Sequence, residues 1–140
     1  MNILSCSAEE TERIGERLAQ SLTGNEFIAL YGGMGMGKTA FVRGLARGLD
    51  IRDEVTSPTF ALVHEYTGKF RLYHFDMYRV EGWDDLYSTG FFDYEGRGVI
   101  VTEWSENIEN AIPENAIRIC FSAGDTENMR NISCDGINIF

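Results

Sequence analysis

Residues 32–39 read GGMGMGKT, and this stretch decides how the rest of the chain is interpreted. It matches the Walker A pattern G-x-x-x-x-G-K-[ST] in full, from Gly32 to Lys38 and Thr39. Backbone N–H groups must come close to phosphate oxygens in such a loop, and side chains would obstruct that approach, which explains the glycines. In this pattern the lysine reaches the β- and γ-phosphates of a nucleotide, and the hydroxyl of the last residue coordinates Mg²⁺. The stretch therefore predicts a phosphate-binding loop.

The elements expected on either side of the loop support this interpretation. The short apolar run FIALY at 27–31, bounded by turn residues, predicts a buried strand. After the loop, one helical face is formed by Phe41, Val42, Leu45 and Leu49. Strand, glycine-rich loop and helix thus follow in the order that the motif requires. The N-terminus of that helix would add its positive dipole end to the phosphate site.

The remaining chain predicts a mixture of helices and strands. In chain order we expect an amphipathic helix at 8–22 with Ser7 and Glu10 at capping-box spacing, an antiparallel hairpin of 60–66 and 70–76 around Gly68, a short helix at 83–89, a buried strand at 98–104, a helix at 105–111 before Pro113, and a final antiparallel pair. This order predicts one P-loop ATPase domain over residues 1–140. Its fold class is α/β, a P-loop NTPase-like sandwich whose mixed sheet has a parallel centre and antiparallel flanking strands. The sequence leaves the strand order and the oligomeric state open.

Composition narrows the class of protein further. The chain has 12 basic and 22 acidic residues, which give a formal net charge of -10. Because an acidic surface repels the phosphate backbone that dominates nucleic-acid affinity, direct high-affinity nucleic-acid binding is not expected. The three cysteines have no C-x-x-C spacing, so they predict reduced thiols and not a disulfide framework or a zinc site. With no apolar stretch of membrane-spanning length and no signal-like N-terminal pattern, we expect a cytoplasmic protein without a membrane partner.

Two carboxylates are candidates for the chemistry next to the loop. Asp76 follows the run FRLYHF and Glu103 follows VIVT, so each lies at the carboxyl end of an expected strand. Open α/β sheets bind their ligands at that edge. A P-loop enzyme needs an acidic residue there to hold Mg²⁺ or its waters, and a group that orients the attacking nucleophile. Which of the two carboxylates meets the metal directly is left open.

The segment TSPTF at 56–60 is a candidate switch. Its hydroxyl residues Ser57 and Thr59 flank a proline, and such a loop could sense the γ-phosphate of a nucleotide. If the following hairpin pivots at Gly68, residue 60 lies opposite residue 76, which brings both hydroxyls close to Asp76. The register could slip by a residue or two.

Other interpretations of these motifs explain less. Gly35, Gly37 and Ala40 also spell the dinucleotide-binding pattern G-x-G-x-x-A, but that pattern leaves the lysine and threonine of the loop unexplained. The run DYEG at 93–96 matches D-x-x-G of guanine-nucleotide switches, but no N-K-x-D motif follows, so ATP is the expected nucleotide. Arg79 could position phosphate, contact a partner or be a solvated surface residue.

Four motifs taken together resemble one family. They are GGMGMGKT at 32–39, SPTF at 57–60, HFDMYR at 74–79 and the pair Glu103 and Trp104. In this order and at these spacings they resemble the bacterial TsaE family, also called YjeE, of tRNA threonylcarbamoyladenosine biosynthesis ATPases. The resemblance covers about residues 8–120. One departure is Gly33, where the family usually has an acidic residue, and its effect is left open.

The resemblance implies a function and a set of site residues. It implies an ATP-binding and ATP-hydrolysing accessory protein for threonylcarbamoyladenosine (t6A) modification of tRNA, which docks on the TsaB–TsaD pair and hydrolyses ATP weakly on its own. Asp76 would take a Walker-B-like part beside catalytic Lys38, and Thr39 with Glu103 would coordinate Mg²⁺. The residues expected to bind ATP are Gly32, Gly33, Met34, Gly35, Met36, Gly37, Lys38, Thr39, Ala40, Ser57 and Thr59. Two alternatives stay open, a P-loop small-molecule kinase and a nucleotide-gated binding module without catalysis.

Overall fold

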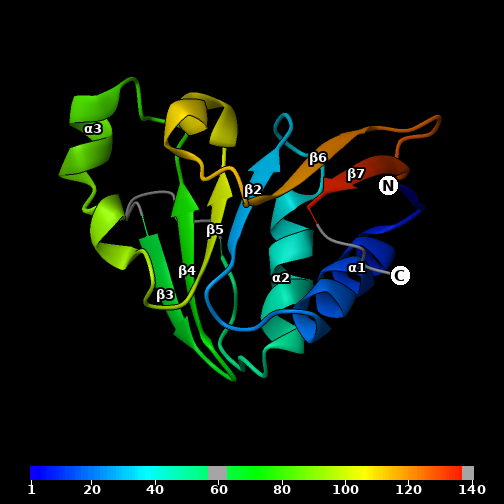
Figure 1. Ribbon diagram of the computed structural model, residues 1–140. Coiled ribbons are helices and arrows are strands. Elements are labelled where there is room, and N and C mark those ends of the chain that lie inside the picture. The colour runs from blue at the N-terminus through cyan, green and yellow to red at the C-terminus, as the bar shows by residue number, and fades with distance from the viewer. Residues whose placement is uncertain (57–62, 137–140) are drawn as a thin grey trace.

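The structure, a computed structural model, describes residues 1–56 and 63–136. Figure 1 shows a twisted sheet with helices on both of its faces. The strands in these residues are β1 Asn2–Ser5, β2 Phe27–Tyr31, β3 Val63–Thr67, β4 Arg71–Asp76, β5 Val99–Glu103, β6 Ile117–Ala123 and β7 Arg130–Asp135. The helices are α1 Ala8–Gln20, α2 Lys38–Gly48, α3 Trp83–Ser88 and the 3₁₀ helices η1 Phe91–Tyr94 and η2 Ser105–Ala111.

The sheet has seven strands in the order β1-β7-β6-β2-β5-β4-β3. The four central strands β6, β2, β5 and β4 run parallel to their neighbours in this group. Antiparallel strands flank them, β3 beside β4 at one edge, and β7 and then β1 beyond β6 at the other. The expected α/β class, with a parallel centre and antiparallel flanks, is therefore confirmed. The carboxyl ends of all four central strands point to one edge of the sheet, and the site described below lies there.

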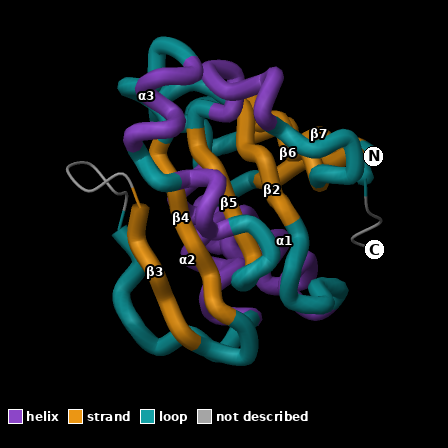
Figure 2. The backbone as a smooth tube through the Cα atoms, turned by 60° about the vertical axis from the view of Figure 1, so that its left-hand side comes forward, coloured by secondary structure: helices purple, strands orange, loops and turns teal. Residues whose placement is uncertain are grey.

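Two apolar cores lie on opposite faces of the sheet. One lies under α1 and α2 and includes Leu18, Phe41 and Leu45. The other lies under α3, η1 and η2 and includes Leu86 and Phe91. Figure 2 shows α1 and α2 together behind the strands. Alternation along β2 explains this arrangement, because Ile28 and Leu30 belong to the first core and Phe27 and Ala29 to the second.

Local sequence signals explain the start of α1 and the burial of β2. Ser7 caps α1 and its hydroxyl accepts a hydrogen bond from the Glu10 N–H at 3.1 Å, as the capping-box spacing predicts. Every residue of β2 except the last is buried, which agrees with its continuous apolar run. The expected helices and strands are present among the described residues with shifts of a few residues at their ends, although the helix expected at 105–111 is a 3₁₀ helix with a non-helical residue, Ile108, inside it.

The hairpin of β3 and β4 differs from expectation in its register. Val63 pairs with Phe75 and Thr67 with Arg71, so the turn is centred on Lys69. A pivot at Gly68 would instead have paired Val63 with residue 73. Gly68 is required for another reason, since a Cβ there would lie 2.2 Å from the Leu49 carbonyl oxygen. The expected switch residues Ser57 and Thr59 lie outside the described residues.

Two features were not expected from the sequence. Strand β1 pairs with β7 and forms one edge of the sheet, although no strand was predicted at residues 2–5. Strand β6 was expected only as half of an antiparallel pair, but it also pairs in parallel with β2 and so belongs to the sheet centre.

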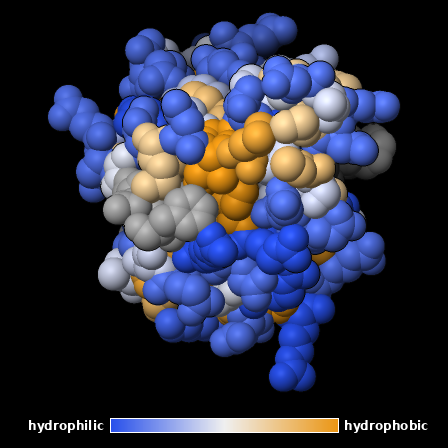
Figure 3. All heavy atoms as spheres, turned by 90° about the vertical axis from the view of Figure 1, so that its right-hand side faces the viewer, coloured by the Kyte–Doolittle hydropathy of each residue, from blue (hydrophilic) through white to orange (hydrophobic). Residues whose placement is uncertain are grey.

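Figure 3 shows the β1 side of the molecule, where an apolar area lies between hydrophilic ones. Across the described residues, no helix is both long and apolar enough to cross a bilayer.

Candidate functional site

The glycine-rich loop connects the carboxyl end of β2 to the first residue of α2, Lys38. Gly32, Gly35 and Gly37 have φ angles of 136°, 76° and 101°, which side-chain-bearing residues rarely adopt. At Gly32 there is also no space, because a Cβ would lie 2.6 Å from the Phe121 carbonyl oxygen. The sequence thus forms a tight loop at a helix N-terminus, and such a loop can bind an anion.

Gly33 differs from the other loop glycines, because neither its backbone conformation nor its surroundings require a glycine. Its φ lies outside the left-handed region, and a Cβ added there would meet no atom within 4 Å. The position is exposed and has room for a larger side chain. The departure from the usual acidic residue of the TsaE pattern therefore relieves no crowding and creates none.

Lys38 is buried at the base of the loop, with 5% of its surface exposed. Its Nζ donates a hydrogen bond to the Gly32 carbonyl oxygen at 2.5 Å and lies 4.2 Å from the centre of the Trp104 ring. Burial lowers the pKa of Lys38, and the nearby charges of Glu103, Glu106 and Asp76 act in the opposite direction. The ammonium group is thus held over the loop by a backbone oxygen and an aromatic face.

Asp76 and Glu103 lie side by side, because the parallel pairing of β4 and β5 puts these two residues opposite each other. Asp76 Oδ1 accepts a hydrogen bond from the Tyr78 N–H at 3.0 Å, and Glu103 is only 5% exposed. Burial raises the pKa of Asp76, and the negative charge of Glu103 adds to the rise, while the Tyr78 N–H opposes it, as do His74 and Lys38. Two crowded carboxylates at this edge would be stabilised by a bound cation.

His74 is part of the same cluster and was not identified from the sequence, where it was interpreted as a strand residue. Its side chain is fully buried, and its Nε2 lies 2.5 Å from Glu103 Oε2. Its Nδ1 has no hydrogen-bond partner among the described residues. The signal that could have identified it is its position two residues before Asp76, because side chains two apart on a strand share a face.

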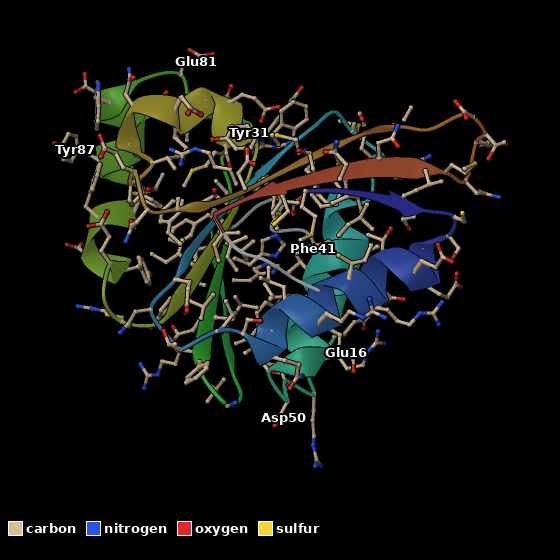
Figure 4. All side chains as sticks on the ribbon, turned by 45° about the vertical axis from the view of Figure 1, so that its right-hand side comes forward. Glu16, Tyr31, Phe41, Asp50, Glu81 and Tyr87 are labelled. Carbon is tan, nitrogen blue, oxygen red and sulfur yellow. The ribbon has the colours of Figure 1, made fainter. Side chains whose placement is uncertain are left out.

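The 3₁₀ helix η2 connects the loop to the carboxylate pair. Glu106 Oε2 accepts a hydrogen bond from the Gly32 N–H at 3.1 Å, and Glu109 Oε2 accepts one from the Tyr31 hydroxyl at 2.6 Å. Figure 4 shows Tyr31 at the end of β2, close to η2. Asn107 Nδ2 donates to the carbonyl oxygens of Met77 and Tyr78, at 2.9 and 3.2 Å. One short helix therefore fixes the segments that follow both β2 and β4.

The C-terminal half of the chain also reaches the loop. Arg130, the first residue of β7, donates from Nη2 to the Gly35 carbonyl oxygen at 3.2 Å. Its Nη1 donates to the carbonyl oxygens of Glu127 and Met129. No sequence signal pointed to Arg130, because this contact joins residues 95 positions apart.

A cavity of about 480 Å³ lies between the loop and the carboxylate pair. Its lining consists of Met34, Gly35, Gly37, Lys38, Thr39, Ala40, Asp76, Tyr78, Arg79, Glu103 and Trp104. The structure thus places most of the residues predicted from the sequence around one space of the size that small-molecule sites usually have. The loop residues Gly32, Gly33 and Met36 lie outside that lining.

The donor set of this cavity fits a magnesium-bound nucleotide. The described residues contain no group of three or more His, Cys, Asp or Glu side chains that could hold a metal ion by themselves. Mg²⁺ does not require such a group, because it usually binds one or two protein oxygens and takes its other ligands from water and phosphates. The Thr39 hydroxyl at the start of α2 and the Glu103 carboxylate line the same cavity and can supply those oxygens.

Comparisons with known proteins show which family and which fold this chain resembles. The family model for "Threonylcarbamoyl adenosine biosynthesis protein TsaE" matches residues 5–132. The tRNA threonylcarbamoyladenosine biosynthesis protein TsaE of Treponema pallidum is 40% identical over 120 residues, which cover 85% of this chain and 89% of the relative. The protein of the same name from Bacillus subtilis is 39% identical over 122 residues, 85% of this chain and 76% of the relative. The crystal structure of Bacillus subtilis YdiB superposes with a TM-score of 0.76 at 33% identity, covering 94% of this chain and 82% of that one.

Proposed function

The chain belongs to the TsaE family of threonylcarbamoyl adenosine biosynthesis proteins, and from this premise we propose that it is a Mg²⁺-dependent ATPase that supports t6A formation in tRNA. One observation carries the ATPase part of the proposal. The loop that ends in Lys38 and Thr39 opens into the same cavity as the adjacent carboxylates Asp76 and Glu103. Phosphate-binding groups and acidic groups on one cavity are what hydrolysis of a nucleoside triphosphate requires.

Each residue has a role that follows from its position. The N–H groups of the loop and the N-terminus of α2 bind the phosphates, and Lys38 exchanges its bond to the Gly32 carbonyl for a phosphate oxygen. Thr39 and Glu103 hold the magnesium ion, which when bound neutralises charge on the β- and γ-phosphates. Asp76 lies beside Glu103 and orients the attacking water. His74 fixes the Glu103 carboxylate from the buried side.

The partner is the second part of the proposal. We propose that the chain acts on the TsaB–TsaD pair through protein contacts and does not modify tRNA itself. The net charge of -10 supports this, because a direct tRNA-modifying enzyme needs a basic surface. ATP hydrolysis would then be slow in the isolated chain and faster in the complex.

The test is ATP turnover by the purified chain with and without the TsaB–TsaD pair. We expect slow, Mg²⁺-dependent release of phosphate from the chain alone and a clear increase when the pair is added. Transfer of label from ATP to a metabolite, with no free phosphate, would favour a kinase instead. Absence of both binding to the pair and stimulation by it would rule out the accessory function.

A further inference from the structure

Arg79 lines the cavity but has no role in the function proposed above. It lies in the segment between β4 and α3. Lys38 and Arg79 supply the two cationic side chains of the cavity lining that the structure describes. The Arg79 side chain is exposed, and within the described residues no hydrogen bond or ion pair holds its guanidinium group. A ligand in the cavity can therefore recruit this group without breaking a contact to any of the described residues.

The backbone on either side of Arg79 is fixed in place. The Met77 N–H donates to the Glu103 carbonyl oxygen at 3.0 Å, and the Tyr78 N–H donates to Asp76 Oδ1 at the same distance. Asn107 holds the carbonyl oxygens of Met77 and Tyr78, as described above. After Arg79, Val80 is 5% exposed and packs in the core under α3. The segment thus carries a guanidinium that is unpaired within residues 1–56 and 63–136, on a backbone anchored to both carboxylate strands.

Charge in the cavity makes such a cation useful. Asp76 and Glu103 both repel the γ-phosphoryl group of a bound nucleotide, and Lys38 lies at the base of the loop. Hydrolysis moves negative charge onto the oxygens of that group and the leaving β-phosphate. A guanidinium offers two parallel N–H donors to phosphoryl oxygens and stays protonated throughout.

We propose that Arg79 is a catalytic residue that contacts the γ-phosphoryl oxygens in the transition state, so that this chain supplies its own transition-state arginine. The inference rests on the proposed ATPase function. In the step it assists, a water oxygen forms a bond to the γ-phosphorus as the bond from that phosphorus to the β–γ bridging oxygen breaks. The products are ADP, inorganic phosphate and one proton, and Arg79 neither gains nor loses a proton.

The test compares ground-state and transition-state binding in Arg79→Gln and Arg79→Lys. The probes are ATP, ADP, and ADP with aluminium fluoride, each with Mg²⁺, and phosphate release is measured in parallel. Arg97→Gln is the control, because Arg97 is an exposed arginine just before β5, at the opposite end of that strand from Glu103. Thermal unfolding of each variant confirms that it is folded.

We expect Arg79→Gln to keep its affinity for ATP and ADP within about threefold but to lose turnover and affinity for the ADP–aluminium fluoride complex by about 100-fold or more. Arg79→Lys should recover only part of this, because an ammonium cannot donate two parallel bonds. The Arg97 variant should match the unchanged chain in all four measurements.

Other outcomes separate the two proposals. If the unchanged chain fails to bind or hydrolyse ATP, the ATPase function itself is wrong, and the role of Arg79 is wrong with it. If hydrolysis proceeds and Arg79→Gln retains its fluoride complex, the ATPase function stands and the role of Arg79 is wrong. A loss of stimulation by the TsaB–TsaD pair, with unchanged basal turnover and fluoride binding, would make Arg79 a partner contact and would also overturn the inference.

Discussion

The chain contains two lysines in very different surroundings, and this contrast provides a test of the loop at the scale of single residues. Lys38 is buried against the Gly32 carbonyl and the Trp104 ring, whereas Lys69 is exposed in the β3–β4 turn. We predict that Lys38→Ala lowers ATP affinity by at least about 100-fold, because charge-assisted bonds to phosphate are lost, and that Lys69→Ala leaves it unchanged. Isothermal titration with MgATP measures both, and unchanged affinity in the Lys38 variant would refute the loop assignment.

Glu103 should behave differently from Lys38. Its carboxylate is buried against His74 and lines the cavity, whereas the loop N–H groups are expected to make most of the phosphate contacts. We predict that Glu103→Gln binds ATP with nearly unchanged affinity and loses turnover by about 100-fold or more. Glu95→Gln, an exposed change in the loop before β5, is the control. If Lys38→Ala and Glu103→Gln both support full product formation by the TsaB–TsaD pair, ATP hydrolysis is not the function of the chain.

The sequence predicted the positions of the two carboxylates, because both follow from strand ends. Asp76 and Glu103 were expected at the carboxyl ends of two strands, and the structure puts them opposite each other. The sequence could not show that His74 contacts Glu103, because that contact depends on which strands are neighbours in the sheet. Arg130 was missed for the same reason. Its contact with the loop depends on the strand order, in which β6 lies between β7 and β2. The catalytic and binding roles of these residues remain predictions.

At the scale of elements, the packing of α1 on α2 depends on glycine. A Cβ at Gly44 would lie 1.7 Å from the Glu12 carbonyl oxygen, and one at Gly15 would lie 2.2 Å from the Phe41 carbonyl oxygen. The two helices are therefore in backbone contact. Because α2 begins at Lys38, this contact also positions the loop.

We predict that Gly44→Ala lowers the free energy of unfolding by about 3 kcal/mol, because the helices must separate to accommodate the methyl group. Gly33→Ala is the matched control, since its Cβ would meet no atom and its backbone is not left-handed, so we expect a change within about 0.5 kcal/mol. Urea unfolding followed by circular dichroism gives both values. Equal stability of the two variants would show that the helix contact is looser than described.

The turn between α1 and β2 predicts a pH dependence. The Glu26 carboxylate accepts hydrogen bonds from the Thr23 N–H and hydroxyl and from the N–H groups of Gly24 and Asn25. Partial burial by itself would raise the pKa of Glu26, but the hydrogen bonds from Thr23 and Gly24 outweigh it, so the pKa lies below its ordinary value. A group whose pKa is lower in the folded state stabilises the fold above its unfolded pKa and stops doing so as the pH falls through the folded pKa.

Glu26→Gln should therefore cost about 1 kcal/mol of unfolding free energy at pH 7, a modest value because the site is partly exposed. The difference from the unchanged chain should shrink as the pH falls below the ordinary glutamate pKa of about 4.3 and through the lower pKa of the folded state, where the carboxylate becomes protonated. Urea unfolding at pH 7 and at pH 3.5 checks this, with Glu95→Gln as the control for general charge effects. A deficit that stays constant at both pH values would mean that the charge of Glu26 is not what stabilises the turn.

Elements with strong local signals were predicted, and those that depend on distant pairing were not. Strand β2 and helix α1 are as expected because a buried apolar run and a capped amphipathic pattern are local properties. Strand β1 has only four residues and no apolar alternation, and it forms because β7 offers it an edge. The parallel pairing of β6 with β2 likewise comes from the return of the chain after η2, which no residue pattern within β6 encodes.

At the scale of the whole molecule, the question is whether the basic residues form a surface for tRNA. The outer faces of α1 and α2 carry Arg13, Arg17, Arg43 and Arg47, but α1 also carries Glu9, Glu10, Glu12 and Glu16. Arg47 pairs with Glu16 at 3.3 Å. One of these arginines therefore has a carboxylate partner, and the four glutamates of α1 offset the formal charge of the four arginines.

We predict that the isolated chain shows no saturable tRNA binding up to about 100 µM at physiological salt, weaker than the nonspecific affinity of basic proteins. Addition of the TsaB–TsaD pair should bring the chain to tRNA through protein contacts. The fluorescence anisotropy of labelled tRNA should therefore rise on addition of the chain only when the pair is present. A control with the pair alone separates its own tRNA binding from that of the assembly. Micromolar binding by the isolated chain that weakens steeply with salt would mean that a local basic site overcomes the net charge of -10, and the chain would then have to be placed in direct contact with tRNA.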